Sequence, residues 1–224
     1  MENIVRKMNI QSLPIFVINL RDAIGRRKKM ERKLKRYGLG FTLIDASLPG
    51  DVVGNYVNYL SGTQRACTYS HIRVLQRIVE QKIPAALVLE DDVLFRSDWV
   101  SVVNSKLGEL EREDSLWDAL FLNVAEPYET LEQWQVARNQ CLAGAYIIRY
   151  EAALWMLQQF SGLYYCIDWM TQVLQQRGHS YTYYPWLAIQ EGTESYNGSN
   201  VDADYAKVIR CLEGSCYGLE HYDF

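Results

Sequence analysis

Short apolar runs alternate along the chain with longer amphipathic stretches. The first run, residues 14–20 (PIFVINL), has the length of a strand and is almost continuously apolar, which is typical of a parallel strand buried on both faces. In residues 22–37, Met30 and Leu34 lie four apart among basic side chains, and Gly38 follows. This spacing predicts an amphipathic helix that is ended by a glycine.

The same alternation continues through most of the chain. Residues 63–81 predict a longer helix whose apolar face includes Cys67 and His71. The remaining elements are predicted from apolar runs and helical spacing: strands over 41–46, 85–89, 118–123, 142–149 and 180–184, and helices over 151–160 and 169–177. Strands and helices in alternation predict an α/β layered fold with a largely parallel central sheet.

Composition and length agree with one globular domain. The 224 residues are 49% hydrophobic and 22% charged, and purely apolar runs such as residues 85–89 are far shorter than the roughly 20 residues that cross a bilayer. An integral membrane protein is therefore not expected. The N-terminus lacks the apolar stretch of a signal peptide, and the five cysteines are irregularly spaced. We therefore expect a cytoplasmic protein with reduced thiols, without a disulfide framework or a CxxC zinc site.

Charge is distributed unevenly along the chain. Residues 1–37 contain 11 Lys and Arg against 3 Asp and Glu, whereas the remainder contains 12 against 24. Binding of nucleic acid by the whole domain is not expected, because no basic surface extends beyond the first segment. The basic segment is expected to be either a solvated helix face or a surface that meets phosphates, of a nucleotide or of an anionic membrane.

Three consecutive carboxylates, Glu90, Asp91 and Asp92, directly follow the apolar run at 85–89. Ligands of open α/β sheets bind at the carboxyl ends of strands. Alternation along an extended chain would direct Glu90 and Asp92 to one side and Asp91 to the other. Their mutual repulsion favours a hard cation such as Mn²⁺ or Mg²⁺, held through Asp92 and Glu90. The alternative is a solvated acidic turn.

Three segments share an order and spacing with a known family: Ile18-Asn19-Leu20 followed by Arg26, CTYSH at 67–71, and LEDDV at 89–93. Over residues 14–195 the chain resembles glycosyltransferase family 25, which includes bacterial lipopolysaccharide and lipooligosaccharide glycosyltransferases and collagen galactosyltransferases. Later segments also fit: residues 144–148, 167–169 and 184–190. The resemblance implies a GT-A-like, Rossmann-like catalytic domain over 1–195, with 196–224 as an irregular C-terminal segment. It also implies an inverting transfer from a nucleotide sugar, usually UDP-galactose, with Mn²⁺ or Mg²⁺.

On the donor side, the resemblance implies that Asn19 and Leu20 meet the nucleotide and that Arg26 meets the diphosphate, as suits a cationic fork. Asn19 is equally compatible with a structural role at the strand end, and Arg26 with a surface role. Ser70 and His71 would hold the donor or shape the floor beneath the carboxylates. The alternative for His71 is a hydrogen-bonded core histidine.

On the catalytic side, the resemblance implies Asp168 as the base that accepts the proton of the acceptor hydroxyl, whereas an N-cap is the structural alternative. Asp91 would assist. Gln64 stands where the family usually has a carboxylate, so it would alter donor contacts or metal affinity. Gln190, in a predicted loop, would reach the acceptor, and Cys67 would serve in packing rather than as a nucleophile.

The sequence therefore predicts an enzyme that moves galactose, or a similar hexose, from a UDP-sugar to a hydroxyl of a lipooligosaccharide or lipopolysaccharide glycan. The basic N-terminal segment would allow peripheral contact with the inner membrane. Two alternatives are a metal-dependent nucleotidyltransferase and a non-catalytic family member that binds glycan or nucleotide.

Overall fold

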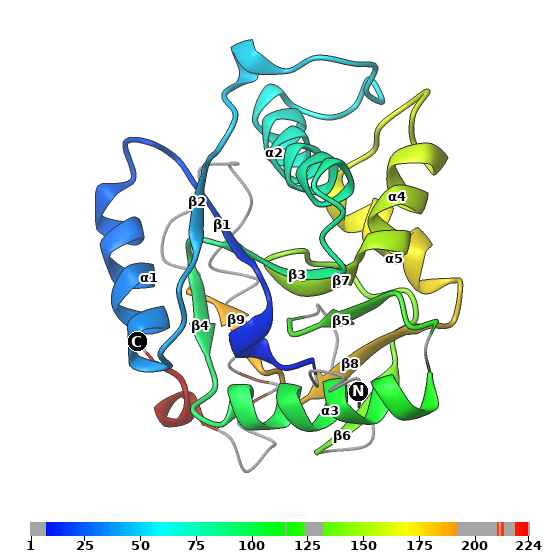
Figure 1. Ribbon diagram of the computed structural model, residues 1–224. Helices are drawn as coiled ribbons and strands as arrows, with labels where there is room; N and C mark the ends of the chain where they lie inside the picture. Colours follow the sequence, from blue (N-terminus) through cyan, green and yellow to red (C-terminus); the bar gives the residue numbers. More distant parts are fainter. Residues whose placement is uncertain are drawn as a thin grey trace.

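The computed structural model describes residues 8–114, 116–123, 132–191, 210, 212 and 218–223. A central seven-stranded sheet with helices on both faces forms the body of the protein (Figure 1). Its strands follow the spatial order β2 (Thr42–Asp45), β1 (Ile15–Asn19), β3 (Ala85–Glu90), β7 (Ala145–Arg149), β5 (Ala119–Phe121), β8 (Ser180–Tyr184) and β6 (Gln133–Val136).

The central sheet is mostly parallel. β1 pairs in parallel with β2 and β3, and β5 pairs in parallel with β8. β7 runs antiparallel to its neighbours β3 and β5, and β6 runs antiparallel to β8. Five strands therefore point one way, and only β6 and β7 point the other. The predicted α/β fold with a largely parallel sheet is confirmed.

Helices cover both faces of this sheet. Alternate residues of β3 pack in opposite directions: Ala86 and Val88 lie in one hydrophobic cluster with α2 (Gly62–Glu80), α4 (Tyr150–Gln159) and α5 (Ile167–Gln175). Leu87 and Leu89 lie in the other cluster with α1 (Ile24–Arg36) and α3 (Trp99–Glu113). Burial on both faces explains why the β1 and β3 sequences are continuously apolar.

The end of α1 forms as the sequence predicts. Gly38 has a φ of +67°, its N–H donates to the Lys35 carbonyl, and the N–H of Leu39 donates to the Leu34 carbonyl. These bonds form a Schellman motif, in which the left-handed residue is most easily a glycine.

Some elements were not predicted. The sequence analysis assigned no helix to α3, although Trp99, Val103, Leu107 and Leu110 are buried at helical spacing. It also missed β6 and the small second sheet, in which β4 (Val93–Phe95) pairs with β9 (Ala188–Gln190). The prediction of a loop at Gln190 was therefore wrong: Gln190 ends a strand, three residues long and too short to leave a clear pattern.

Three short 3₁₀ helices complete the described elements: Ile10–Ser12, Pro49–Asp51 and Leu219–His221. Most of the predicted C-terminal segment, 196–224, lies outside the described residues. Of its described part, Tyr222 is buried in the hydrophobic core and Asp223 hydrogen-bonds Phe95 of β4. Within the described ranges, no helix combines the length and apolar character needed to span a bilayer.

Candidate active site

The acidic segment lies where the carboxyl ends of β1 and β3 meet. These strands are parallel neighbours, and Asn19 ends one while Glu90 ends the other. The buried side chain of Asn19 donates from Nδ2 to Asp91 Oδ2 at 2.6 Å and to the Ala23 carbonyl at 3.2 Å. Asn19 thereby fixes both the acidic segment and the chain that enters α1.

Arg26, in the first turn of α1, contacts two carboxylates. Its Nη1 atom lies 2.9 Å from Asp91 Oδ1 and 3.6 Å from Asp92 Oδ2. Asp91 and Asp92 form a turn after β3, so strand alternation ends at Glu90 and the two aspartates share one guanidinium. The prediction that Asp91 faces away from Asp92 was therefore wrong. The predicted contact of Arg26 with a diphosphate stays a prediction.

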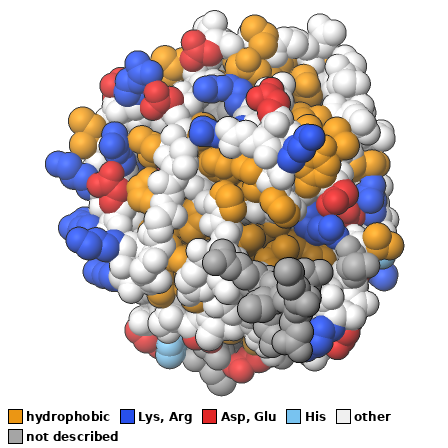
Figure 2. Space-filling view, viewed as in Figure 1, with side chains coloured by type: hydrophobic (Ala, Val, Ile, Leu, Met, Phe, Trp, Pro, Cys, Tyr) orange, Lys and Arg blue, Asp and Glu red, His pale blue; other side chains and the backbone are white. Residues whose placement is uncertain are grey.

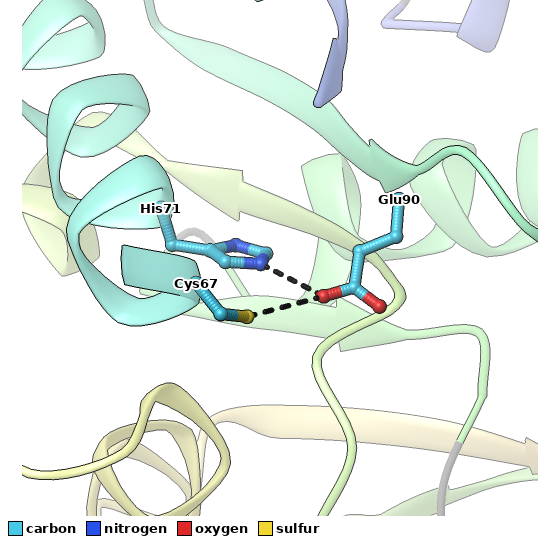
Figure 3. A group of neighbouring side chains, drawn as sticks. All are labelled: Cys67, His71 and Glu90. Carbon is cyan, nitrogen blue, oxygen red and sulfur yellow. Dashed lines mark hydrogen bonds and ion pairs between the residues drawn. The ribbon is translucent and has the colours of Figure 1, made fainter. Parts of the chain in front are cut away.

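Glu90 is held by three side chains. Its Oε1 atom lies 3.3 Å from His71 Nε2 and 3.6 Å from Cys67 Sγ, both on one face of α2 (Figure 3). Its Oε2 atom accepts a hydrogen bond from Gln190 Nε2 at 2.9 Å. Burial raises the pKa of Glu90, but the hydrogen bonds from His71, Cys67 and Gln190 outweigh this effect, and the pKa falls below its usual value. These contacts therefore favour the ionised form of Glu90.

Asp92 has the opposite electrostatic environment. Burial and the negative charge of Glu90 raise its pKa to about 7, against the opposing charge of Arg26. Its Oδ1 atom is buried and has no hydrogen-bond partner within the described part of the chain. A buried, unsatisfied carboxylate oxygen beside an ionised carboxylate fits a hard divalent cation, which binds oxygen ligands and offsets both charges.

Asp168, in the first turn of α5, lies close enough to Glu90 and His71 for their charges to affect its pKa. The N–H of Ile167 donates to Thr68 Oγ1 at 3.0 Å, which places the first turn of α5 against α2. Burial and the charge of Glu90 raise the pKa of Asp168 to about 6, while His71 and the backbone N–H of Ala143 oppose this shift. The N-cap of α5 is Cys166, so the alternative that Asp168 is the N-cap was wrong.

Three other predicted site residues have contacts elsewhere. Ser70 is buried, donates to the Ala66 carbonyl and accepts from the N–H of Ser47, which ties α2 to the chain after β2. Gln64 is exposed and forms a capping box with Ser61 at the start of α2. Leu20 is half-buried just after β1.

Four residues of the site make contacts that the sequence did not predict. Cys67 packs against the core as predicted and also contacts Glu90, and Gln190 binds Glu90 as well. The Tyr146 hydroxyl lies 3.1 Å from His71 Nδ1. Asn123 accepts from the N–H of Ala145, and its buried Nδ2 atom has no partner among the described residues. The sequence signals were the family-like segments at 67–71, 144–148 and 184–190, which include Cys67, Tyr146 and Gln190, and the position of Asn123 at the end of an apolar run. None of these patterns predicted the contacts.

Gly144 lies where the side chains of Asn123 and Gln190 approach the backbone closely. A Cβ atom at this position would lie 3.0 Å from Asn123 Nδ2 and 3.5 Å from the Gln190 side chain. The carbonyl of Gly144 also accepts the N–H of Glu90. Gly144 therefore leaves room for the Asn123 and Gln190 side chains next to the end of β3.

Basic side chains gather along the side of the molecule formed by α1 (Figure 2). Arg26 belongs to this helix and reaches into the site, whereas Arg27 forms an exposed pair with Glu31. The N-terminal positive charge is therefore partly directed at the acidic segment and partly solvated.

Comparisons with known proteins identify the family of this chain. Residues 12–171 match the sequence model of a family described as glycosyltransferase family 25 (LPS biosynthesis protein). The chain is 28% identical over 137 residues to procollagen galactosyltransferase 1-B of Xenopus laevis, covering 51% of this chain and 22% of that protein. It is 33% identical over 88 residues to the lacto-N-neotetraose biosynthesis glycosyltransferase LgtB of Neisseria meningitidis serogroup B, covering 35% of this chain and 32% of that protein.

A third relative is named as inactive. The chain is 26% identical over 125 residues to the inactive glycosyltransferase 25 family member 3 of Homo sapiens, covering 48% of this chain and 21% of that protein. The matched segments span less than a third of the length of each of these three relatives. The family match itself includes most of the chain and every candidate residue except Gln190, and the protein belongs to glycosyltransferase family 25.

Proposed function

We propose that this protein transfers a hexose, galactose in the simplest case, from a UDP-sugar to a hydroxyl of a lipooligosaccharide or lipopolysaccharide glycan, with inversion. The observation that carries the proposal is the convergence of Glu90, Asp92 and Asp168 at one end of the sheet of a family 25 chain. The names of two relatives, a galactosyltransferase and a lacto-N-neotetraose biosynthesis enzyme, support the sugar and the acceptor class.

Asp92 and Glu90 would hold Mn²⁺ or Mg²⁺. When bound, such an ion supplies positive charge that offsets the charge developing on the departing diphosphate. Asn19 and Arg26 fix the acidic turn through Asp91. Arg26 would also lie beside the donor diphosphate, and Asn19 and Leu20 would lie beside the nucleotide.

Asp168 is the proposed general base. A group with a pKa of about 6 is largely ionised at neutral pH and accepts a proton more readily than an ordinary aspartate. Both oxygens of Asp91 are engaged, by Asn19 and Arg26. We therefore assign Asp91 to positioning and Asp168 to proton transfer.

A non-catalytic role is the second candidate, because one relative is named as inactive and because Gln64 replaces a carboxylate. Membership in a glycosyltransferase family favours sugar transfer over nucleotidyl transfer. The basic helix α1 is the surface through which we would expect any peripheral contact with an anionic membrane.

The test is release of UDP from UDP-galactose by the full chain with Mn²⁺, with and without a lipooligosaccharide acceptor. We expect acceptor-dependent release of UDP, and its near loss in Glu90→Gln. The matched control is Glu80→Gln, an exposed change at the far end of α2, which should keep activity. UDP binding without acceptor-dependent release for any UDP-hexose would favour the non-catalytic role.

A further inference from the structure

Cys67, His71 and Glu90 form a compact group of three different metal-ligand types (Figure 3). Cys67 and His71 lie one turn apart on α2, and Glu90 faces them from the end of β3. One atom from each residue, a sulfur, a nitrogen and an oxygen, lies within 4.8 Å of the other two.

Two of the three separations between these atoms match those of ligands around a tetrahedral zinc ion. Zinc bonds of roughly 2.3 Å to sulfur and roughly 2.0–2.2 Å to nitrogen and oxygen place tetrahedral ligands about 3.6 Å apart for sulfur and oxygen, and about 3.4 Å apart for nitrogen and oxygen. The observed separations are 3.6 Å from Cys67 Sγ to Glu90 Oε1 and 3.3 Å from His71 Nε2 to the same oxygen. The third pair, Cys67 Sγ and His71 Nε2, lies within 4.8 Å.

The surrounding contacts resemble the outer shell of a metal site. The Tyr146 hydroxyl lies 3.1 Å from the other ring nitrogen of His71, and Gln190 binds the other oxygen of Glu90. Such contacts fix the orientation of metal ligands. His71 is fully buried, whereas Cys67 and Glu90 are partly exposed, so an ion would enter beside them and keep a fourth position for water.

We propose that Cys67, His71 and Glu90 form a binding site for a borderline-soft divalent cation such as Zn²⁺. Thiolate and imidazole select zinc over Mg²⁺ or Mn²⁺, which prefer oxygen. The site therefore differs in ligand chemistry from the hard-cation site proposed at Asp92, although both include Glu90. Binding of the ion displaces the thiol proton of Cys67 to solvent, and the site is independent of a sugar donor.

Co²⁺ and Zn²⁺ added to the intact, chelator-treated chain test the proposal without any sugar donor. We expect Co²⁺ to produce a thiolate-to-metal charge-transfer band and the intense visible bands of tetrahedral coordination, and Zn²⁺ to abolish both. Cys67→Ser should remove the charge-transfer band and weaken Zn²⁺ binding at least tenfold by calorimetry. Cys141→Ser, another half-buried cysteine, is the matched control and should keep both.

Glu90→Gln provides a second variant that leaves the thiol intact, and circular dichroism verifies its fold. It should weaken Zn²⁺ binding while the charge-transfer band persists at saturating Co²⁺. A charge-transfer band that survives in Cys67→Ser, or a wild-type Co²⁺ spectrum with only weak octahedral bands, would overturn the proposal. Both readouts are measured without a sugar donor, so they do not depend on whether the protein transfers a sugar. Failure of the proposed function is therefore distinguished from failure of this proposal.

Discussion

Asp92 and Glu90 are separated by one residue, yet their pKa values are shifted in opposite directions. Glu90 accepts from Gln190 and contacts His71 and Cys67, which lower its pKa, whereas Asp92 keeps one buried oxygen without a partner in the described ranges and has a pKa raised to about 7. The sequence predicted an acidic strand end and its chemistry. It did not predict this difference, because the partners of Glu90 lie about 20 residues before it and 100 after it along the chain. Long-range pairing leaves no local pattern.

Replacing Asp168 by Asn tests the proton-transfer assignment. Asn keeps the size of the side chain but cannot accept the acceptor proton, so the kcat of transfer should fall by roughly 10²–10⁴. UDP binding should survive, because Asp92 and Glu90 are unchanged. Loss of a negative charge in the first turn of α5 should cost only about 0.3–1 kcal/mol of stability.

A matched variant separates catalysis from helix stabilisation. Glu151 lies in the first turn of α4 and is largely exposed, so Glu151→Gln removes a similar helix-dipole interaction outside the site. It should lower the melting temperature slightly and leave kcat unchanged. Near-normal transfer in Asp168→Asn would assign the base to another carboxylate.

At the scale of the elements, strands and helices were predicted correctly where burial or a local backbone requirement determines the residue types. β1 and β3 are apolar up to their last residues, Asn19 and Glu90, because both faces of the sheet are covered. α1 is followed by Gly38 because the residue that ends its last turn is left-handed. The short strands β4, β6 and β9 were missed. Three or four residues hold too little alternation to be recognised, and their formation depends on partners that are far away in sequence.

Gly38→Ala tests the C-terminal stop of α1. A Cβ atom at Gly38 meets nothing within 4 Å, so the cost comes from the backbone alone. Holding alanine at a φ of +67° should cost roughly 1–2 kcal/mol. The melting temperature should fall, while UDP binding at a fixed temperature below the transition is unchanged.

Gly40→Ala is the control for this substitution. Gly40 is also exposed with open space around its Cβ position, but its φ is outside the left-handed region. Alanine there should be neutral or slightly stabilising, because it restricts the unfolded chain. Equal effects of the two substitutions would contradict the backbone explanation.

At the scale of the whole molecule, the sheet order assembles the site. β1 and β3 are neighbours although α1, β2 and α2 separate them in the chain, and this places Asn19 beside Asp91. Insertion of the antiparallel strand β7 next to β3 brings Tyr146 to His71. The sequence predicted the fold class but not the strand order, because apolar runs of similar composition are interchangeable as neighbours. The resemblance to the family, rather than periodicity, predicted that Asp168 acts together with the acidic segment.

Stability of the whole chain provides the remaining test of the donor site. A ligand that binds only the folded state at 100 times its Kd adds about 2.7 kcal/mol, which for a protein of this size raises the melting temperature on the order of 5–10 °C. We expect UDP with Mn²⁺ to produce such a shift, and UDP with EDTA to produce almost none.

Asp92→Asn should bind UDP weakly in both conditions, because the buried oxygen that lacks a partner among the described residues is then part of a neutral amide. Glu80→Gln should match the wild type. Equal shifts for wild type with Mn²⁺, wild type with EDTA and Asp92→Asn would show that UDP binds without a cation at Asp92, and the metal assignment would then be wrong even if transfer is observed.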